Sequence, residues 1–128
     1  MKTIIALAVI TLGLSAVSIQ AQSGVYTPAV GSPQRKAILD GVRKFRQAPN
    51  EVYTPRLFRV AGGWAYVAAD DPNEPGVDTL GFHLVLRKSG GTWKVVDQIS
   101  HVEGTDYVSE VRRIRRKFRS VPRGLFQS

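Results

Sequence analysis

Two diglycine turns constrain this chain more than any other feature. Gly62-Gly63 and Gly90-Gly91 each lie between two segments that favour β-strands, because these segments are rich in β-branched and aromatic residues or alternate apolar with polar positions. Glycine readily adopts the positive φ angles that tight hairpin turns require. The sequence therefore predicts four antiparallel strands in two hairpins. The flanking segments are residues 56–60, 64–68, 80–86 and 93–99.

One helix is predicted before these strands. Ser32 suits an N-cap position. Pro33 suits the first helical position, because an amide at that position makes no hydrogen bond within the helix and proline therefore loses none. Ile38, Val42 and Phe45 follow at helical spacing, which places them on one apolar face. We expect a helix that packs this face against the sheet.

A second helix is predicted over residues 107–119, and it is strongly basic. Its apolar stripe consists of Tyr107, Val111, Ile114 and Phe118. A basic amphipathic helix can bind an acidic protein or an anionic membrane surface. It can equally dock on its own domain and leave its cations in water, and both interpretations stay open at this point. The candidate binding residues are Arg112, Arg113, Arg115, Arg116, Lys117 and Arg119.

The N-terminus has the layout of a cleavable secretory signal. Met1 and Lys2 give a short basic start, residues 3–19 carry no charge, and Ala21 is a small residue at the expected cut. An uncleaved membrane anchor is the alternative, because the uncharged run is near the lower length for a membrane span. We therefore expect a periplasmic or secreted protein. The predicted organisation is a signal peptide at 1–21, a mobile lead-in at 22–31 and one domain at 32–128.

Composition restricts the chemistry and the partners. The chain has 18 Lys and Arg against 10 Asp and Glu, a formal net charge of +8, two histidines and no cysteine. A basic domain commonly binds nucleic acid, but export favours a protein partner or an anionic envelope component, with membrane-surface contact as an alternative. Without cysteine there is no thiol nucleophile, and two histidines do not predict a zinc site. We expect no cofactor and no metal.

The strand patterns resemble those of a known superfamily. The last strand of many NTF2-like domains is similar to Gly91-Thr92-Trp93-Lys94-Val95-Val96-Asp97. Residues 63–67 and 86–88 resemble a group of small exported bacterial proteins of that superfamily that have no assigned activity. The resemblance covers residues 33–101 and implies the cystatin-like fold, in which a sheet wraps around one helix. Full NTF2-like domains usually carry two or three helices before the sheet, whereas this chain has one predicted helix there.

Enzymes of the NTF2-like superfamily use Asp or His inside a pocket for proton transfer, which directs attention to three residues. Strict alternation places Asp97 on one face with Trp93 and Ile99, where burial would raise the pKa of its carboxyl and suit it to act as a general base. A strand-end carboxylate paired with an arginine is the alternative. His83 falls on the face opposite the leucines of its strand, and His101 lies in a polar loop. We predict no catalytic residue and keep Asp97 and His101 as weak candidates.

Two tryptophans, Trp64 and Trp93, each follow closely on a diglycine turn. They could form a pair of aromatic binding platforms. A tryptophan at the start of a strand more often covers the end of a hydrophobic core, and we expect this second role.

The sequence thus predicts an α+β domain with one antiparallel sheet of about four strands, one helix packed across it and a basic C-terminal helix. The predicted function is a non-enzymatic exported binding domain of inhibitor, immunity or accessory type. The alternatives are a small-ligand binder or weak enzyme that uses the concave face of the sheet near Phe82, Trp93 and Asp97, and a membrane or wall surface binder that uses the 107–119 helix. The predicted core consists of Ile38, Val42, Phe45, Phe58, Val60, Trp64, Tyr66, Leu80, Phe82, Leu84, Leu86, Trp93 and Val95, with Val111, Ile114 and Phe118 added if the last helix docks.

Overall fold

Two α-helices, a short 3-10 helix and a four-stranded sheet make up the part of the chain that the structure describes. The structure is a computed structural model and describes residues 24–73, 81–100 and 107–126. The predicted signal peptide, Leu80 and His101 lie outside these residues. Along the chain the elements are α2 (Pro33–Arg46), β1 (Pro55–Ala61), β2 (Trp64–Ala69), β3 (Phe82–Ser89), β4 (Thr92–Gln98), α3 (Tyr107–Lys117) and η1 (Arg123–Phe126).

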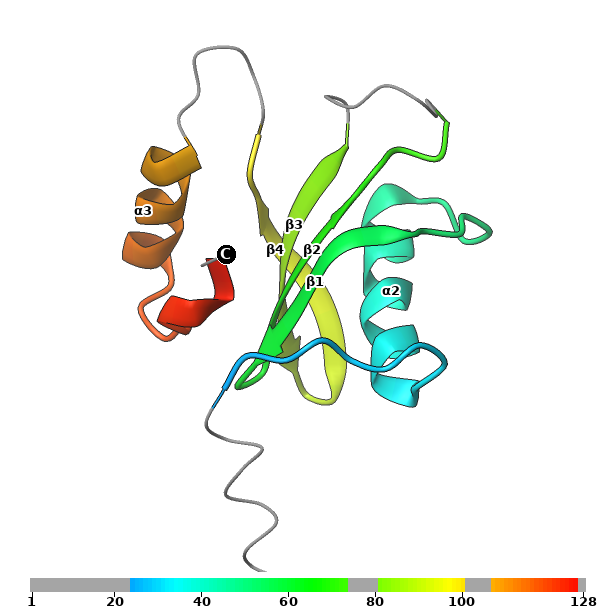
Figure 1. Cartoon of the computed structure of the whole chain (residues 1–128), viewed down its shortest axis with the longest axis horizontal. Helices are drawn as coiled ribbons and strands as arrows, with labels where there is room; N and C mark the ends of the chain where they lie inside the picture. The colour runs from blue at the N-terminus through cyan, green and yellow to red at the C-terminus, as the bar shows by residue number, and fades with distance from the viewer. Residues whose placement is uncertain (1–23, 74–80, 101–106, 127–128) are drawn as a thin grey trace, which may run out of the picture.

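The sheet is an antiparallel meander with the strand order β1-β2-β3-β4 (Figure 1). Both diglycine turns adopt the predicted conformation, because Gly62 and Gly63 have φ angles of 53° and 83°, and Gly90 and Gly91 have φ angles of 58° and 81°. Residues other than glycine rarely adopt such angles at both turn positions. The prediction of an α+β fold with four antiparallel strands is confirmed. Pairing of β2 with β3 joins the two hairpins into one sheet.

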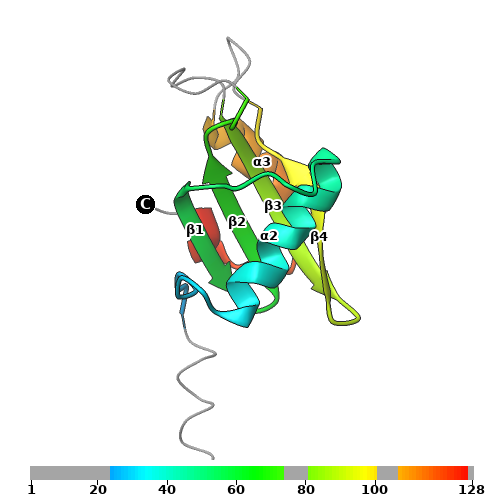
Figure 2. The ribbon, with the colours of Figure 1, turned by 90° about the vertical axis from the view of Figure 1, so that its right-hand side faces the viewer.

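Helices cover both faces of the sheet. Figures 1 and 2 show α2 across one face and α3 with η1 on the other. Each face therefore has its own hydrophobic core, and β2 is buried at every position. The core beneath α2 contains Ile38, Leu39, Val42, Tyr53, Phe58, Val60, Ala65, Val67, Ala69, Leu84, Leu86 and Trp93. The core beneath α3 and η1 contains Ala61, Trp64, Tyr66, Val85, Ile99, Ile114, Val121, Leu125 and Phe126.

Helix α2 begins and approaches the sheet as its sequence dictates. The Ser32 hydroxyl oxygen accepts a hydrogen bond from the Arg35 amide at 3.2 Å, which confirms Ser32 as the N-cap. Gly41 lies against β4, since a Cβ atom there would be 2.6 Å from the Trp93 carbonyl oxygen. The helix ends at Arg46 because Gln47 adopts a left-handed conformation with a φ of 57°.

The core prediction for α2 is wrong at Phe45, which is 48% exposed. The helix runs obliquely across the sheet towards β4, so its last turn reaches the edge of the sheet (Figure 2). There Phe45 lines a shallow groove with Lys94 and Val95. Leu39 of the same helix is buried, in contrast to Phe45. Phe82 and Val95 belong to the core only in part, because both are half-buried.

The segment before α2 is attached to the sheet. The Tyr26 amide donates a hydrogen bond to the Val60 carbonyl oxygen at 3.0 Å, and the Val60 amide donates to the Tyr26 carbonyl oxygen at 2.7 Å. The Thr27 hydroxyl donates to the Phe58 carbonyl oxygen at 2.7 Å. These bonds cover part of the outer edge of β1, which would otherwise present unpaired backbone groups. Tyr26 and Thr27, which belong to the predicted lead-in at 22–31, thus contact the edge of the sheet.

Candidate functional site: the basic surface of α3 and η1

The basic helix docks on its own domain through the apolar stripe that the sequence predicts. Ile114 is completely buried, and Val111 and Phe118 pack against the same core as half-buried residues. The Phe118 ring meets the Trp64 ring edge to face, with 5.4 Å between the ring centroids. Tyr107 is the exception, because it remains 37% exposed. The docked interpretation of the helix is confirmed.

A β-bulge in β4 determines the face on which Asp97 lies. Leu86 pairs with Val95, but the preceding residue Val85 pairs with Asp97, so Val96 is an extra residue in β4. Val95 therefore packs against the core beneath α2, whereas Asp97 contacts Arg113 of α3, and its partner Val85 belongs to the core beneath α3. Our alignment of Asp97 with Trp93 is wrong, because strict alternation does not hold across a bulge.

Asp97 anchors α3 to the sheet by charge. Its side chain is only 8% exposed. Arg113 donates two hydrogen bonds to it, from Nη2 to Oδ1 at 2.9 Å and from Nη1 to Oδ2 at 3.0 Å. The Lys117 ammonium lies 3.4 Å from Oδ2. Arg113 also donates from Nε to Glu110 at 2.8 Å and from Nη2 to the Gln98 carbonyl oxygen at 3.2 Å.

The protonation of Asp97 fits an anchoring role. Burial pushes the pKa of its carboxyl upwards, but hydrogen bonds from Arg113 and from the Gln98 amide outweigh this effect and hold the pKa below its usual range. Hydrogen bonds to Asp97 and Glu110 raise the pKa of Arg113. An ionised carboxylate with this many donors is a weak base. The geometry therefore favours the ion-paired alternative for Asp97 over general-base chemistry.

His83, the other catalytic candidate among the described residues, belongs to a hydrogen-bonded contact between two strands. Its Nδ1 lies 2.7 Å from the hydroxyl oxygen of Tyr66, a completely buried residue of the core beneath α3. Burial raises the pKa of the Tyr66 hydroxyl, so this hydroxyl stays protonated at neutral pH. The pair joins β2 to β3 at the face that α3 covers.

The outer side of α3 keeps cations that no described carboxylate neutralises. Residues 107–126 include seven basic residues and one acidic residue. Arg113 and Lys117 use Asp97 and Glu110, but Arg112 and Arg116 are exposed and form no ion pair with a carboxylate of the described residues. The same holds for Arg119, which lies in the turn after α3.

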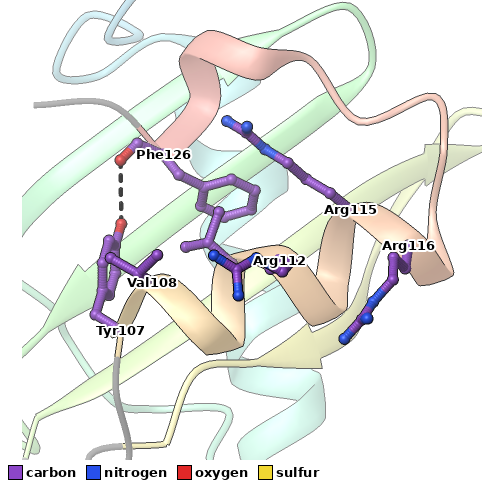
Figure 3. Close-up of a pocket in the computed structure, with 7 residues that line it drawn as sticks. Tyr107, Val108, Arg112, Arg115, Arg116 and Phe126 are labelled. Carbon is purple, nitrogen blue, oxygen red and sulfur yellow. Dashed lines mark hydrogen bonds between the residues drawn. The ribbon is translucent and has the colours of Figure 1, made fainter.

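Arg115 connects α3 to η1. Its Nη2 atom donates a hydrogen bond to the Arg123 carbonyl oxygen at 2.7 Å. Its Nε atom is buried and has no acceptor among the described residues. A second hydrogen bond joins α3 to η1, because the Tyr107 hydroxyl donates to the Phe126 carbonyl oxygen at 3.1 Å (Figure 3).

A pocket of about 390 Å³ lies between α3 and η1. In Figure 3 the Phe126 ring lies between the side chains of Arg112 and Arg115, and Arg116 extends from the next turn of the helix. Phe126 is buried, whereas Val108 at the mouth of the pocket is 57% exposed. We call this region the α3–η1 surface. Its residues are Tyr107, Val108, Val111, Arg112, Arg115, Arg116 and Phe126.

Sequence reasoning found the arginines of this surface but missed its apolar half. Pro122 and Gly124 predict only the end of the helix, whereas the chain turns back as η1 and places Phe126 over α3. Apolar residues within the basic C-terminal segment were the signal that could have predicted a buried element after α3. Val121, Leu125 and Phe126 are all buried.

Both tryptophans belong to hydrophobic cores, on opposite faces of the sheet. Trp64 is 3% exposed on the α3 side and Trp93 is 5% exposed on the α2 side. Their predicted role as core residues is confirmed. The concave-face site considered for Phe82, Trp93 and Asp97 is not assembled, because Asp97 lies on the opposite face and α2 covers the other two residues.

A second polar cluster fastens the loops at the end of α2. Arg46 donates from Nε to Glu51 at 2.8 Å and from Nη2 to Asp71 at 3.1 Å, and the Tyr53 hydroxyl donates to Glu51 at 2.7 Å. The bonds from Arg46 and Tyr53 lower the pKa of Glu51 to about 2, while burial and the Glu51 bond raise the pKa of Tyr53 to about 12. Asn73 completes the cluster by donating to Glu51 at 3.0 Å. Each member has a partner within the cluster, so we assign it a structural role.

Comparison of the chain with protein-family models, with curated proteins and with solved structures finds no match. Among the described residues, no three His, Asp or Glu side chains are grouped so that they could hold a metal ion. None of the helices in the described ranges has the length and apolar character needed to cross a membrane.

Proposed function

We propose that this chain is an exported, non-enzymatic binding domain that engages an anionic partner protein through the α3–η1 surface. The observation that carries the proposal is the position of Arg112 and Arg116, which line a pocket and have no carboxylate partner among the described residues. Like charges this close repel one another on a helix. An anionic partner would relieve that repulsion, and charge complementarity would speed the encounter.

The buried stripe of α3 favours a protein partner over insertion into a membrane. A helix that lies in a membrane interface buries its own apolar face among the lipids. In this domain Ile114 and Phe118 already use that face to cover the sheet. Insertion would require α3 to leave the core, whereas a partner protein can bind to the surface as it stands.

The proposal extends to the fold family. One helix packed across an antiparallel meander of four strands supports a cystatin-like assignment, in line with the resemblance of the strand sequences. In this domain the face opposite α2 is covered by α3 and η1. Inhibitor, immunity and accessory proteins all match a small domain of this kind, and identification of the partner would choose among them.

Affinity capture from an envelope extract tests the proposal. The baits are residues 22–128, the same chain with Arg112→Gln and Arg116→Gln, and a control with Lys44→Gln and Lys94→Gln, which removes equal charge from exposed positions on α2 and β4. We expect one protein to be retained in defined stoichiometry by the first and third baits and lost by the second. Retention by all three, or by none, would contradict a binding role for this surface.

A further inference from the structure

The pocket in the α3–η1 surface combines an apolar floor with a cationic rim, and this combination restricts what can occupy it. We call its apolar lining residues Val111 and Phe126 the floor, and Arg112, Arg115 and Arg116 line the same pocket. In Figure 3 Arg112 and Arg115 lie on either side of the Phe126 ring, and Arg116 extends from the next turn of the helix. A purely anionic ligand would leave the floor in contact with water, while a purely apolar ligand would leave the cations without partners. The occupant that satisfies both presents a negative group next to an apolar group.

The rim favours a carboxylate as the negative group. Arg112 and Arg116 are four residues apart on α3, so they are neighbours on one side of the helix, with Cβ atoms about 5–6 Å apart. A guanidinium group offers a planar fork of donors that matches the two oxygens of a carboxylate. One carboxylate between the two side chains could therefore accept hydrogen bonds from both.

The open side of the pocket favours a polypeptide over a free small molecule. Sites for small molecules enclose most of the ligand surface, but here Val108 and Tyr107 at the mouth are 57% and 37% exposed. Apolar surface therefore continues beyond the pocket, where a longer ligand would cover it. A flat membrane surface does not fill a concave site, whereas a side chain that projects from an extended segment does.

Resting on the proposed function, we infer that the pocket binds an extended acidic segment of the partner protein. One Asp or Glu of that segment lies between Arg112 and Arg116, and a neighbouring aliphatic or aromatic side chain packs on Phe126 and Val111. Recognition therefore requires both groups in one short segment, and net negative charge alone is insufficient.

Fluorescence anisotropy with defined peptides tests this inference. The probes are labelled octapeptides of Gly and Ser that carry one Glu and one Leu, with zero to three residues between them. Matched peptides replace Glu by Gln or Leu by Ser. The protein variants are the Arg112→Gln and Arg116→Gln double variant, Val108→Ser, and the Lys44→Gln and Lys94→Gln control. Urea midpoints of all variants verify that each one is folded.

We expect at least one Glu–Leu spacing to bind, with at least tenfold weaker binding after loss of Glu or of the two arginines. Loss of Leu, or Val108→Ser, should weaken binding at least threefold, and the lysine control should bind like the unaltered chain. The inference is wrong if no spacing binds better than its Gln or Ser counterpart. It is also wrong if the protein binds vesicles of three parts phosphatidylcholine to one part phosphatidylglycerol while ignoring every peptide.

The two experiments can contradict the acidic-segment inference without contradicting the proposed function. If the peptides do not bind but capture of a protein still depends on Arg112 and Arg116, the proposed function stands and only the acidic-segment inference is lost. If capture is independent of these arginines as well, both are lost.

Discussion

Replacing Ile114 by alanine tests whether α3 is an integral layer of the domain. Ile114 is the completely buried residue of α3 and packs in the core with Trp64, Tyr66 and Val85. The proposed binding surface depends on this packing, because an undocked helix would separate its arginines from Phe126. The substitution removes three carbon atoms at the centre of the contact and leaves every charge of α3 in place.

The expected loss of stability follows from the burial of Ile114. Each buried methylene or methyl group contributes about 0.8 kcal/mol, so three carbons correspond to roughly 2.4 kcal/mol before any cavity term is added. The cavity that remains increases the cost, and buried Ile→Ala substitutions typically lose about 2–5 kcal/mol. We expect about 3–4 kcal/mol, a large part of the roughly 5–15 kcal/mol that stabilises a small domain.

Equilibrium urea unfolding of residues 22–128 measures this loss. With a slope of about 1–3 kcal/mol per molar urea, the midpoint should fall by roughly 2 M. Val108→Ala is the matched control, because Val108 lies on the same helix but is 57% exposed, and its substitution should change stability by less than about 0.5 kcal/mol. A loss below about 1 kcal/mol for Ile114→Ala would refute the docked position of α3.

Three further predictions concern the opposite side of the sheet. Gly41→Ala should destabilise the domain by about 1–2 kcal/mol in urea unfolding, because its Cβ would lie 2.6 Å from the Trp93 carbonyl oxygen and overpacking outweighs the better helix propensity of alanine; a stabilised variant would contradict this close approach. Phe45→Ala should cost only about 1 kcal/mol, since the side chain is 48% exposed, and a loss above about 3 kcal/mol would show that it is buried after all. Glu51 has a folded pKa of about 2, below its ordinary 4.5, so its stabilising contribution is complete above pH 4.5 and is lost as pH falls towards 2. Glu51→Gln should accordingly flatten the dependence of the urea midpoint on pH in this window, and an unchanged profile would argue against the Arg46–Glu51 pair.

Local signals in the sequence predicted the secondary structure well, because each depends on residues that are close together in the chain. The diglycine turns fixed both hairpins, since the positive φ of Gly62 and Gly90 restricts those positions in any fold. Ser32 and Pro33 marked the start of α2 for the same kind of reason. The spacing of Ile114 and its apolar neighbours identified the face by which α3 docks.

The parts that could not be predicted depend on the relative placement of elements. The exposure of Phe45 follows from the oblique path of α2 towards β4, which helical periodicity does not encode. The attachment of Tyr26 to β1 follows from an open strand edge that becomes visible only once the sheet exists. The pocket requires Phe126 to return over α3, and Leu125 and Phe126 are both buried in the core on that side of the sheet.

The bulge in β4 is a local feature of one strand that affects how α3 is placed on the sheet. Because Val96 is an extra residue, the Asp97 carboxylate faces α3 and holds Arg113 and Lys117, which are four residues apart on one side of that helix. Arg112 and Arg116 have the same spacing but lie one residue earlier, about 100° further around the helix. Fixing one pair against the sheet therefore turns the other pair to a different side of the helix, where both arginines are exposed and line the pocket. Asp97 thus supports the proposed binding site from a distance, since together with the buried Ile114 it holds the helix that carries the arginines in one orientation.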